Sequence, residues 1–282
     1  VKECADDFGQ MNSEILRTPI PIGGVAGDQQ AATIGQACFQ KGMIKSTYGT
    51  GCFALLNTGD QFVLSKNKLL STIAYKINGK ICYALEGSIF IAGAVVQWLR
   101  DSINIIDKAD QVGHLASKAK DQDIYFVPAF TGLGAPYWDP NARGAIFGLL
   151  RDTGREEIAL AALESIGYQT RDLLEAMIKD VEGMKRDDVK LRVDGGMTQS
   201  SLTMKVLSDL TGVEIHIPTI QESTAKGVAW LAGMRAGLYN QLEVFEKEWA
   251  LKETFSPLIS ANERDKKYQG WKEAVGKTGT ST

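Results

Sequence analysis

The stretch IKSTYGTGCFALL, residues 44–56, places two runs of strand-forming residues on either side of a Gly-Thr-Gly turn. β-Branched and aromatic residues favour extended structure, and glycines permit the tight reversal that joins antiparallel strands. We therefore predict a β-hairpin whose turn lies at residues 49–51. A second hairpin is predicted downstream, because residues 70–77 and 80–85 flank Asn78-Gly79, a pair typical of tight turns.

Beyond the hairpins, extended and helical patterns alternate along the chain. Apolar residues spaced by three or four positions predict helices, and short β-branched runs predict strands. The predicted helices cover residues 28–38, 89–106, 156–181, 200–211 and 224–236, and the predicted strands cover residues 20–27, 125–130, 190–194 and 214–217. Residues 107–123 are expected to form a polar connection, and residues 133–143 an ordered loop. This order predicts fold class α/β, with a mixed sheet flanked by helices.

The size and composition fit one large domain. Of the 282 residues, 44% are apolar and 23% are charged, which is enough apolar surface for a full core. Neither a linker nor a repeat divides the chain, so we predict a single domain over residues 1–275. Residues 276–282 are small and polar, and we expect them to form a disordered tail.

Charge and apolar patterning argue against several classes of protein. The 34 acidic and 31 basic residues give a net charge of −3, which disfavours nucleic acid as a partner. Residues 89–99, one of the longest apolar stretches, are interrupted by Gly and Gln and are far shorter than the roughly 20 residues of a membrane span. The four cysteines lack disulfide spacing, and neither histidine lies at metal-ligand spacing. We therefore predict a cytoplasmic chain without a metal site of its own.

Three glycine-flanked turns carry the chemistry that the sequence suggests. They lie at residues 27–29, 48–51 and 194–196. At such turns backbone N–H groups can approach phosphate oxygens because no Cβ intervenes, and the first turn of a helix favours anions. Thr50 adds a hydroxyl donor. Each turn also has a purely structural interpretation, in which glycine only closes a hairpin or adjoins a helix, and the residues alone leave both open.

Asp28, in the first of these turns, has two interpretations as well. As the first residue of a helix it would act as an N-cap, which contributes roughly 1 kcal/mol to stability. Beside a phosphate-binding turn it would act as a base that removes a proton from a hydroxyl group attacking a phosphoryl group. Composition does not decide between them.

Taken together, the motifs resemble the FGGY family of carbohydrate kinases. The matching segments are AGDQQAA at 26–32, STYGTGCF at 46–53, ALEGSIF at 84–90, QWLR at 97–100, VPAF at 127–130, GLGAPYWDP at 132–140 and VDGG at 193–196. A second signature of the family, Gly144-x-Ile146-x-Gly148-Leu149 followed after seven residues by Glu157-Ile158-x-x-Ala161-Ala162-Leu163-Glu164, is also met. The resemblance covers residues 1–240.

The resemblance implies an actin-like ATPase domain, related to ribonuclease H, that forms one half of a two-domain kinase. The other half, an N-terminal kinase domain of the same polypeptide, is expected to be absent from this chain, so the chain by itself is expected to be inactive. The implied reaction is phosphorylation of glycerol to glycerol 3-phosphate by ATP. The ligands of the accompanying Mg²⁺ are expected in the N-terminal domain. ATP or ADP and glycerol are thus the expected partners, and the sequence leaves open whether copies form a homo-oligomer.

The resemblance also assigns roles to individual residues. Asp28 corresponds to the catalytic base and belongs to the glycerol site, together with Gln29 and Phe53. Six residues correspond to nucleotide-binding positions, namely Gly49 and Thr50 at the phosphates, Gly93, Gln97, Gly196 and Ser200. The family usually carries Asn where this chain has Ser200, so that a shorter hydroxyl side chain replaces an amide near the adenine.

Two other functions fit the same residues. One is a different FGGY kinase that acts on a pentose or another polyol, since part of the substrate site would lie in the N-terminal domain. The other is a non-catalytic nucleotide-binding module of the actin type. Asp28 argues against the module, because a protein that only binds nucleotide needs no base near the γ-phosphate.

Overall fold

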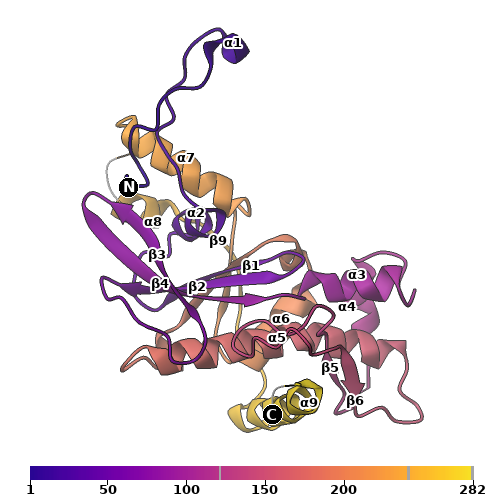
Figure 1. The fold of residues 1–282 in the computed structure, drawn as a ribbon. Helices are drawn as coiled ribbons and strands as arrows, with labels where there is room; N and C mark the ends of the chain where they lie inside the picture. The colour runs from indigo at the N-terminus through magenta and orange to yellow at the C-terminus, as the bar shows by residue number, and fades with distance from the viewer. Residues whose placement is uncertain (121, 240–241, 281–282) are drawn as a thin grey trace.

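A mixed seven-stranded sheet lies at the centre of the computed structural model, which describes residues 1–120, 122–239 and 242–280, with residues 15 and 16 described by their backbone only. The strand order is β3-β4-β2-β1-β7-β8-β9 (Figure 1). The bounds are Met43–Tyr48 for β1, Cys52–Gly59 for β2, Leu70–Ile77 for β3, Lys80–Ile89 for β4, Lys190–Asp194 for β7, Ile215–Pro218 for β8 and Leu251–Phe255 for β9. Strands β5 (Tyr125–Val127) and β6 (Ala145–Phe147) form a separate antiparallel pair.

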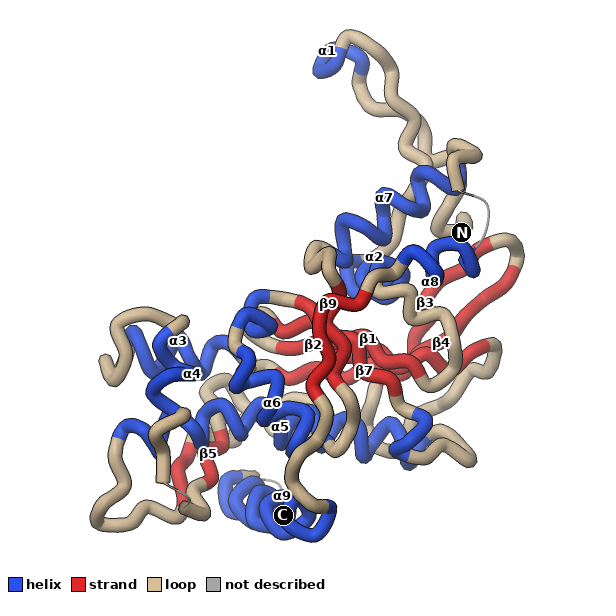
Figure 2. Tube along the Cα trace, turned by 180° about the vertical axis from the view of Figure 1, so that it is seen from behind, coloured by secondary structure: helices blue, strands red, loops and turns tan. Residues whose placement is uncertain are grey.

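Helices cover both faces of this sheet. They are α1 (Ser13–Leu16), α2 (Asp28–Gly35), α3 (Gly93–Asp101), α4 (Gln111–Ala116), α5 (Arg155–Asp180), α6 (Ser201–Thr211), α7 (Ser223–Arg235), α8 (Leu242–Glu248) and α9 (Ala261–Thr278), with 3₁₀ turns η1 (Arg186–Asp188) and η2 (Gly196–Gln199). Helices α2 and α7 pack on one face and α5 and α6 on the other, with α9 outside the second pair (Figures 1 and 2). The sheet is therefore the middle layer of a sandwich.

Both predicted hairpins are confirmed. Strands β1 and β2 pair antiparallel, with Tyr48 opposite Cys52 on either side of the glycine turn. Strands β3 and β4 pair around Asn78-Gly79, where Asn78 adopts the left-handed backbone conformation that such turns require. Strand β7 pairs parallel with both β1 and β8, which makes the sheet mixed as predicted. The carboxyl ends of β1, β7 and β8 consequently meet at one edge of the sheet.

The apolar core lies on both sides of the sheet. The larger cluster fills the space between the sheet and α5 and includes Ile44, Tyr48 and Leu163. A smaller cluster lies under α2 and α7 and includes Ile34, Leu55 and Trp230. Because side chains alternate along a strand, Ile44 of β1 faces α5 while its neighbour Lys45 faces α2.

Three predicted segments differ from the structure. The helix expected over residues 89–106 is shorter, because Ile89 still pairs with Cys52 in the sheet and α3 begins only at Gly93. The connection expected over residues 107–123 contains α4, and residue 121 lies outside the described residues. Residues 20–27 form isolated bridges with the first ten residues instead of a strand, and they belong to the arm that extends away from the sheet (Figure 1).

The end of the chain also differs from the prediction of a disordered tail. Helix α9 continues to Thr278, and its Trp271 is fully buried and stacks on Tyr168 with ring centroids 5.2 Å apart. The Thr280 hydroxyl donates to Asp139 Oδ1 at 2.7 Å. Packing of α9 therefore orders residues 276–280, and residues 281–282 lie outside the described residues.

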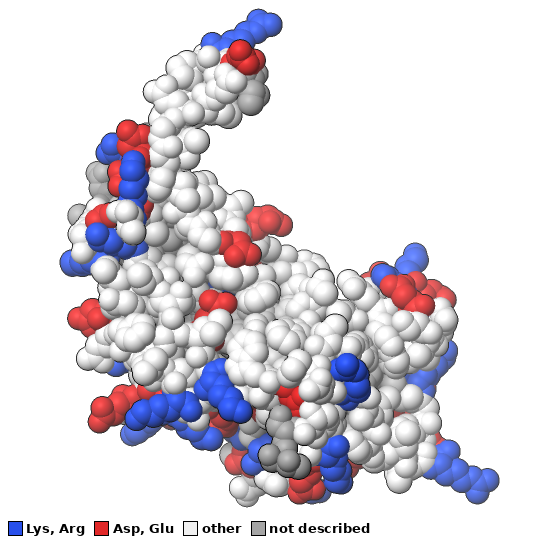
Figure 3. All heavy atoms as spheres, viewed as in Figure 1, with Lys and Arg blue, Asp and Glu red and all other residues white. Residues whose placement is uncertain are grey.

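The surface view adds two observations. On the face shown in Figure 3, Lys and Arg are interspersed with Asp and Glu along the lower edge, and uncharged atoms cover much of the middle. The described residues thus form no extended basic patch on this face. Among the helices in the described part of the chain, none is both long and apolar enough to span a bilayer.

Candidate active site

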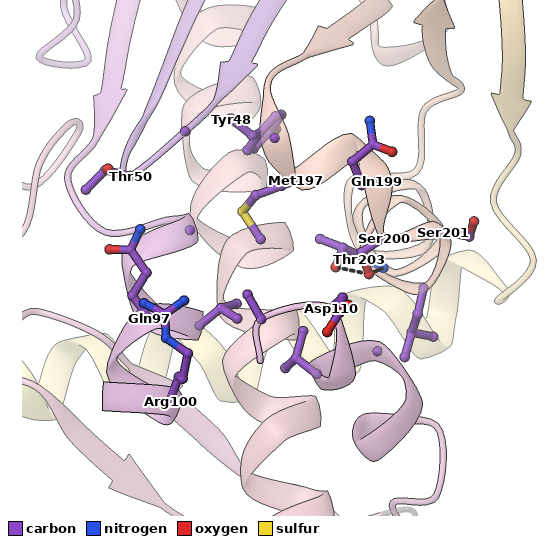
Figure 4. Close-up of a pocket in the computed structure, with 18 of the residues that line it drawn as sticks. Tyr48, Thr50, Gln97, Arg100, Asp110, Met197, Gln199, Ser200, Ser201 and Thr203 are labelled. Carbon is purple, nitrogen blue, oxygen red and sulfur yellow. Dashed lines mark hydrogen bonds between the residues drawn. The ribbon is translucent and has the colours of Figure 1, made fainter. Parts of the chain in front are cut away.

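A cleft of about 660 Å³ opens beside the carboxyl ends of β1 and β7. Its walls come from the β1–β2 turn, α3, α4 and the segment from η2 into α6 (Figure 4). The cleft is lined by all six residues predicted to bind nucleotide: Gly49, Thr50, Gly93, Gln97, Gly196 and Ser200. The fold therefore gathers into one place six residues that span 152 sequence positions, although their binding of nucleotide stays a prediction.

The β1–β2 turn is held against the first turn of α3. The Gly93 N–H donates to the Gly49 carbonyl oxygen at 2.9 Å, and the Ala92 N–H donates to the Thr50 carbonyl oxygen at 2.9 Å. A Cβ on Gly93 would lie only 2.5 Å from the Gly49 oxygen, so only glycine permits this approach. Both Gly49 and Thr50 remain exposed at the cleft. Hydrogen bonds thus fix the turn against α3, while its other side is open to the cleft.

The two glycines after β7 have different roles. Gly195 adopts φ 94° and ψ 170°, a conformation that is essentially restricted to glycine, and its added Cβ would lie 2.3 Å from the Tyr48 carbonyl oxygen. An added Cβ on Gly196 would meet no atom within 4 Å. Gly195 is therefore required by the backbone, whereas Gly196 leaves space where a ligand can approach the amide groups at the start of η2.

Ser200 is the N-cap of α6. Its hydroxyl oxygen accepts from the Thr203 N–H at 3.3 Å and is hydrogen-bonded to the Thr203 hydroxyl at 2.8 Å (Figure 4). These two contacts occupy the acceptor capacity of the Ser200 oxygen and leave its own O–H as the group available to a ligand. Ser200 therefore has a structural role that the sequence did not predict.

The cleft has further polar residues that the sequence analysis missed. Arg100 lies one turn after Gln97 on α3, and Figure 4 shows both side chains on the cleft side of this helix. Asp110 and His114 line the opposite wall, and they were missed because their segment was expected to be a connection. Apolar walls from Val96, Val112, Met197 and Leu202 complete the cleft. A mostly apolar cleft with a few polar groups is typical of a small-molecule site.

Asp28 is the first residue of α2 and is exposed. The N-cap is Gly27, which has no side chain to cap the helix, so the capping interpretation of Asp28 does not describe this helix. Both carboxylate oxygens of Asp28 instead accept from Gln29: Oδ1 from the backbone N–H at 2.8 Å, and Oδ2 from the side-chain Nε2 at 3.2 Å. The carboxylate is therefore held by its neighbour while it faces solvent.

Lys45, another residue that the sequence analysis missed, lies beneath this carboxylate. It is fully buried, and its Nζ donates to the Gln29 side-chain oxygen and, at 3.4 Å, to the Phe53 carbonyl oxygen. Burial lowers the pKa of Lys45, and the nearby charge of Asp194 opposes that effect. Lys45 thus links Gln29 and Phe53, two of the three residues predicted for the glycerol site. A charged residue inside an otherwise buried strand was the signal that could have revealed it.

The described residues include no cluster of three or more His, Cys, Asp or Glu side chains that could hold a metal ion. Asp110 is the one carboxylate among the residues that line the described cleft. The cleft itself therefore does not fit a protein-bound divalent cation, whereas its open glycine Gly196 and exposed Thr50 fit a phosphate chain.

Comparison with known families and proteins identifies what this chain is similar to. Residues 44–236 match the C-terminal domain of the FGGY family of carbohydrate kinases. The chain is 59% identical over 281 residues to a glycerol kinase of Roseobacter denitrificans, covering 99% of this chain and 56% of that protein. A glycerol kinase of Sinorhizobium fredii is 59% identical over 279 residues, again with 56% of its length covered. The chain spans about half the length of the curated relatives it matches.

Solved structures show the same fold. The crystal structure of Plasmodium falciparum glycerol kinase with ADP superposes with a TM-score of 0.90 and 36% sequence identity, covering 100% of this chain and 56% of that chain. A ligand-bound xylulose kinase from Lactobacillus acidophilus superposes with a TM-score of 0.85 at 22% identity, over 98% of this chain and 56% of that one. The predicted actin-like ATPase fold with a mixed sheet is confirmed.

Proposed function

The chain belongs to the FGGY family of carbohydrate kinases, and from that premise we propose that it is the nucleotide-binding half of an enzyme that phosphorylates glycerol with ATP. One observation carries the proposal: the cleft gathers Gly49, Thr50 and Gly196, three residues suited to phosphate, at the sheet edge where β1 and β7 end. Glycerol is the proposed acceptor because curated relatives at 59% identity are glycerol kinases.

In the proposed reaction the chain has two tasks. The backbone around Gly49 and Gly196, with the Thr50 hydroxyl, holds phosphate oxygens by donating hydrogen bonds. Asp28 accepts the proton of the attacking glycerol hydroxyl group, and Gln29 and Phe53 hold the polyol. ATP supplies the phosphoryl group: the bond between its γ-phosphorus and the β–γ bridging oxygen breaks as the bond to the glycerol oxygen forms, and ADP leaves. Catalysis depends on positioning and charge stabilisation rather than on a covalent enzyme intermediate.

We propose that an N-terminal domain completes this site. The described cleft is open to solvent on the Thr50 side and offers no metal-binding cluster, so the ligands of Mg²⁺ are assigned to that domain. Closure of two domains over the substrates would also exclude water from the transferred phosphoryl group. A cytoplasmic location is proposed because ATP is the substrate and the four cysteines, Cys4, Cys38, Cys52 and Cys82, are free thiols.

The proposal is tested with the 282-residue chain and with a fusion kinase, in which the N-terminal domain of the Roseobacter denitrificans relative precedes Val1. We expect the chain to bind ADP in calorimetry but to form no glycerol 3-phosphate at rates typical of kinases, and the fusion kinase to form it from ATP and glycerol. The unmodified relative serves as the positive control. Steady turnover by the chain alone would contradict the two-domain site, and glycerol-independent ATP consumption by the fusion kinase would contradict the acceptor.

A further inference from the structure

Lys45 is a buried cation on what we call the acceptor side of the molecule, the surroundings of Asp28, Gln29 and Phe53, which are the residues proposed to hold glycerol. It sits on β1 between Leu55 of β2 and Arg192 of β7, its neighbours in the sheet, and its side chain points toward α2. None of its surface is exposed. A lysine loses hydration and side-chain freedom when it is buried, so its retention in an interior position calls for specific partners.

Its partners are the two elements that carry the proposed acceptor site. Lys45 Nζ donates to the side-chain oxygen of Gln29 on α2 and to the backbone oxygen of Phe53 on β2. Asp194, a carboxylate that is 2% exposed and stands opposite Thr47 in the β1–β7 pair, favours the charged form of Lys45. The ammonium group therefore sits between α2, β2 and β7.

The donor-only chemistry of lysine fixes the orientation of the Gln29 amide. An amide group has one accepting and one donating end, and only the accepting oxygen can face an ammonium group. The Gln29 nitrogen must then point the other way, where it donates to Asp28 Oδ2 at 3.2 Å. With the amide reversed, its oxygen would face the Asp28 carboxylate, and two acceptors would meet without a proton between them. The direction of the hydrogen bonds from Lys45 to Gln29 and from Gln29 to Asp28 is thus set by the buried lysine, which can only donate.

We propose that Lys45 is a positioning residue for phosphoryl transfer, which orients the Gln29 amide and through it the Asp28 carboxylate. This inference rests on the proposed function, in which Asp28 takes a proton from the acceptor hydroxyl. Lys45 contacts neither the acceptor nor the phosphate turn in this scheme. Its effect therefore falls on the rate of the chemical step, because a small misplacement of a catalytic group reduces kcat without weakening nucleotide binding.

The kinetic test compares Lys45→Met with Lys41→Met in the fusion kinase. Methionine is likewise unbranched, is one heavy atom shorter and removes the donor, and Lys41 is an exposed lysine just before the same strand. We expect Lys45→Met to lower kcat about 10- to 100-fold with the KM for ATP within about twofold of the parent. Lys41→Met should leave both parameters unchanged.

A double-mutant cycle shows whether Lys45 acts through Gln29. If it does, Lys45→Met should lower kcat less than about twofold further in a Gln29→Leu background, because the amide that it orients is already gone. If the double variant instead loses the product of the two single-variant reductions in kcat, Lys45 does not act through Gln29. A kcat for Lys45→Met within about twofold of the parent, at equal folded fraction, would overturn the role itself.

A measurement on the 282-residue chain tests the fixed orientation of the Gln29 amide without an activity assay. In the NMR spectrum of the parent, the side-chain amide protons of Gln29 should be shifted from the values of an exposed glutamine and exchange more slowly, and Lys45→Met should bring their shifts and exchange rates toward those of an exposed glutamine. Unchanged Gln29 signals in Lys45→Met, or an already exposed-like amide in the parent, would refute the fixed orientation. If the parent fusion kinase phosphorylates no glycerol, the proposed function fails, and these signals alone decide the Lys45–Gln29 contact.

Discussion

The proposed nucleotide cleft and the proposed acceptor side of the molecule are built in different ways. In the cleft, the decisive positions are glycines, and what they contribute is backbone geometry: a Cβ at Gly93 or Gly195 would lie 2.5 Å or less from a carbonyl oxygen. On the acceptor side, the decisive groups are side chains, with Asp28 held by Gln29 and Gln29 by Lys45. The cleft thus depends on glycines that leave room for close backbone contacts, and the acceptor side depends on a series of side-chain hydrogen bonds.

This difference predicts how each region responds to substitution. Loss of a backbone position should appear first as lost stability, because the clash exists whether or not a ligand is bound. Loss of a side-chain donor or acceptor on an exposed helix end should appear as lost rate with little change in stability. Substitutions at five positions, Asp28, Gly195, Gly196, Thr50 and Ser200, test this contrast, from the largest expected effect to the smallest.

Asp28→Asn in the fusion kinase should have the largest effect. Removal of a general base typically lowers kcat about 10²- to 10⁴-fold, and Asn keeps the size of the side chain. Since Gly27 rather than Asp28 is the N-cap of α2, the melting temperature and ADP affinity should stay close to those of the parent. Turnover of the Asn variant near the parent level would show that Asp28 is not the base.

Gly195→Ala should destabilise the chain, whereas Gly196→Ala should not. At φ 94° and ψ 170° an alanine costs about 1–3 kcal/mol of folding free energy from backbone strain, before the contact with the Tyr48 oxygen is counted. Gly196 has open space around its Cβ position, so its substitution should retain stability and instead obstruct a bound phosphate. Urea unfolding of both variants and ADP titration of Gly196→Ala measure the two effects. Equal stability of the two variants would show that the backbone at Gly195 does not require glycine more than the backbone at Gly196 does.

Thr50→Val separates the contribution of a side chain to ADP binding from that of the backbone within the cleft. Valine has the same shape but no hydroxyl group, and Thr50 is exposed, so stability should not change. A lost hydrogen bond costs roughly 0.5–1.5 kcal/mol, or up to about 3 kcal/mol when the acceptor is charged. Calorimetric titration of ADP into both chains should show a correspondingly weaker Kd. An unchanged Kd would assign phosphate binding to the backbone alone or remove it from this turn.

The walls of the cleft could be predicted from the sequence better than the contacts on the acceptor side, for a physical reason. Glycine turns and hairpins are local signals, so the walls around Gly49 and Gly196 could be predicted from short stretches. The contact between Lys45 and Gln29 joins residues sixteen positions apart and depends on which face of β1 the lysine occupies. That face is fixed only by the pairing of β1 with β2 and β7. The short helix α4, which contains His114 and has Asp110 as its N-cap residue, was likewise missed in a polar stretch, and it packs on α5 in the structure.

Ser200→Asn should have the smallest effect. Ser200 both stabilises the backbone as a helix cap and presents a side-chain group to the cleft. Ser200 caps α6 through its contacts with Thr203, and Asn is an equally good N-cap, so the free energy of unfolding should change by no more than a few tenths of a kcal/mol. Asn also extends an amide further into the cleft, with two donors and an acceptor where Ser200 offers one free O–H.

If the adenine contact typical of the family is merely absent here, the added amide should tighten ADP binding a few-fold, by about 0.5–1 kcal/mol. Ser201→Asn is the matched comparison, because Ser201 also lines the cleft and is exposed but is the first residue of α6 and not its N-cap. Calorimetry with the parent and both variants measures the difference. Weaker binding in Ser200→Asn, at unchanged stability, would mean that the Ser200 hydroxyl already contacts the nucleotide, and the cleft would then depend on a side chain where the comparison assigns it to the backbone.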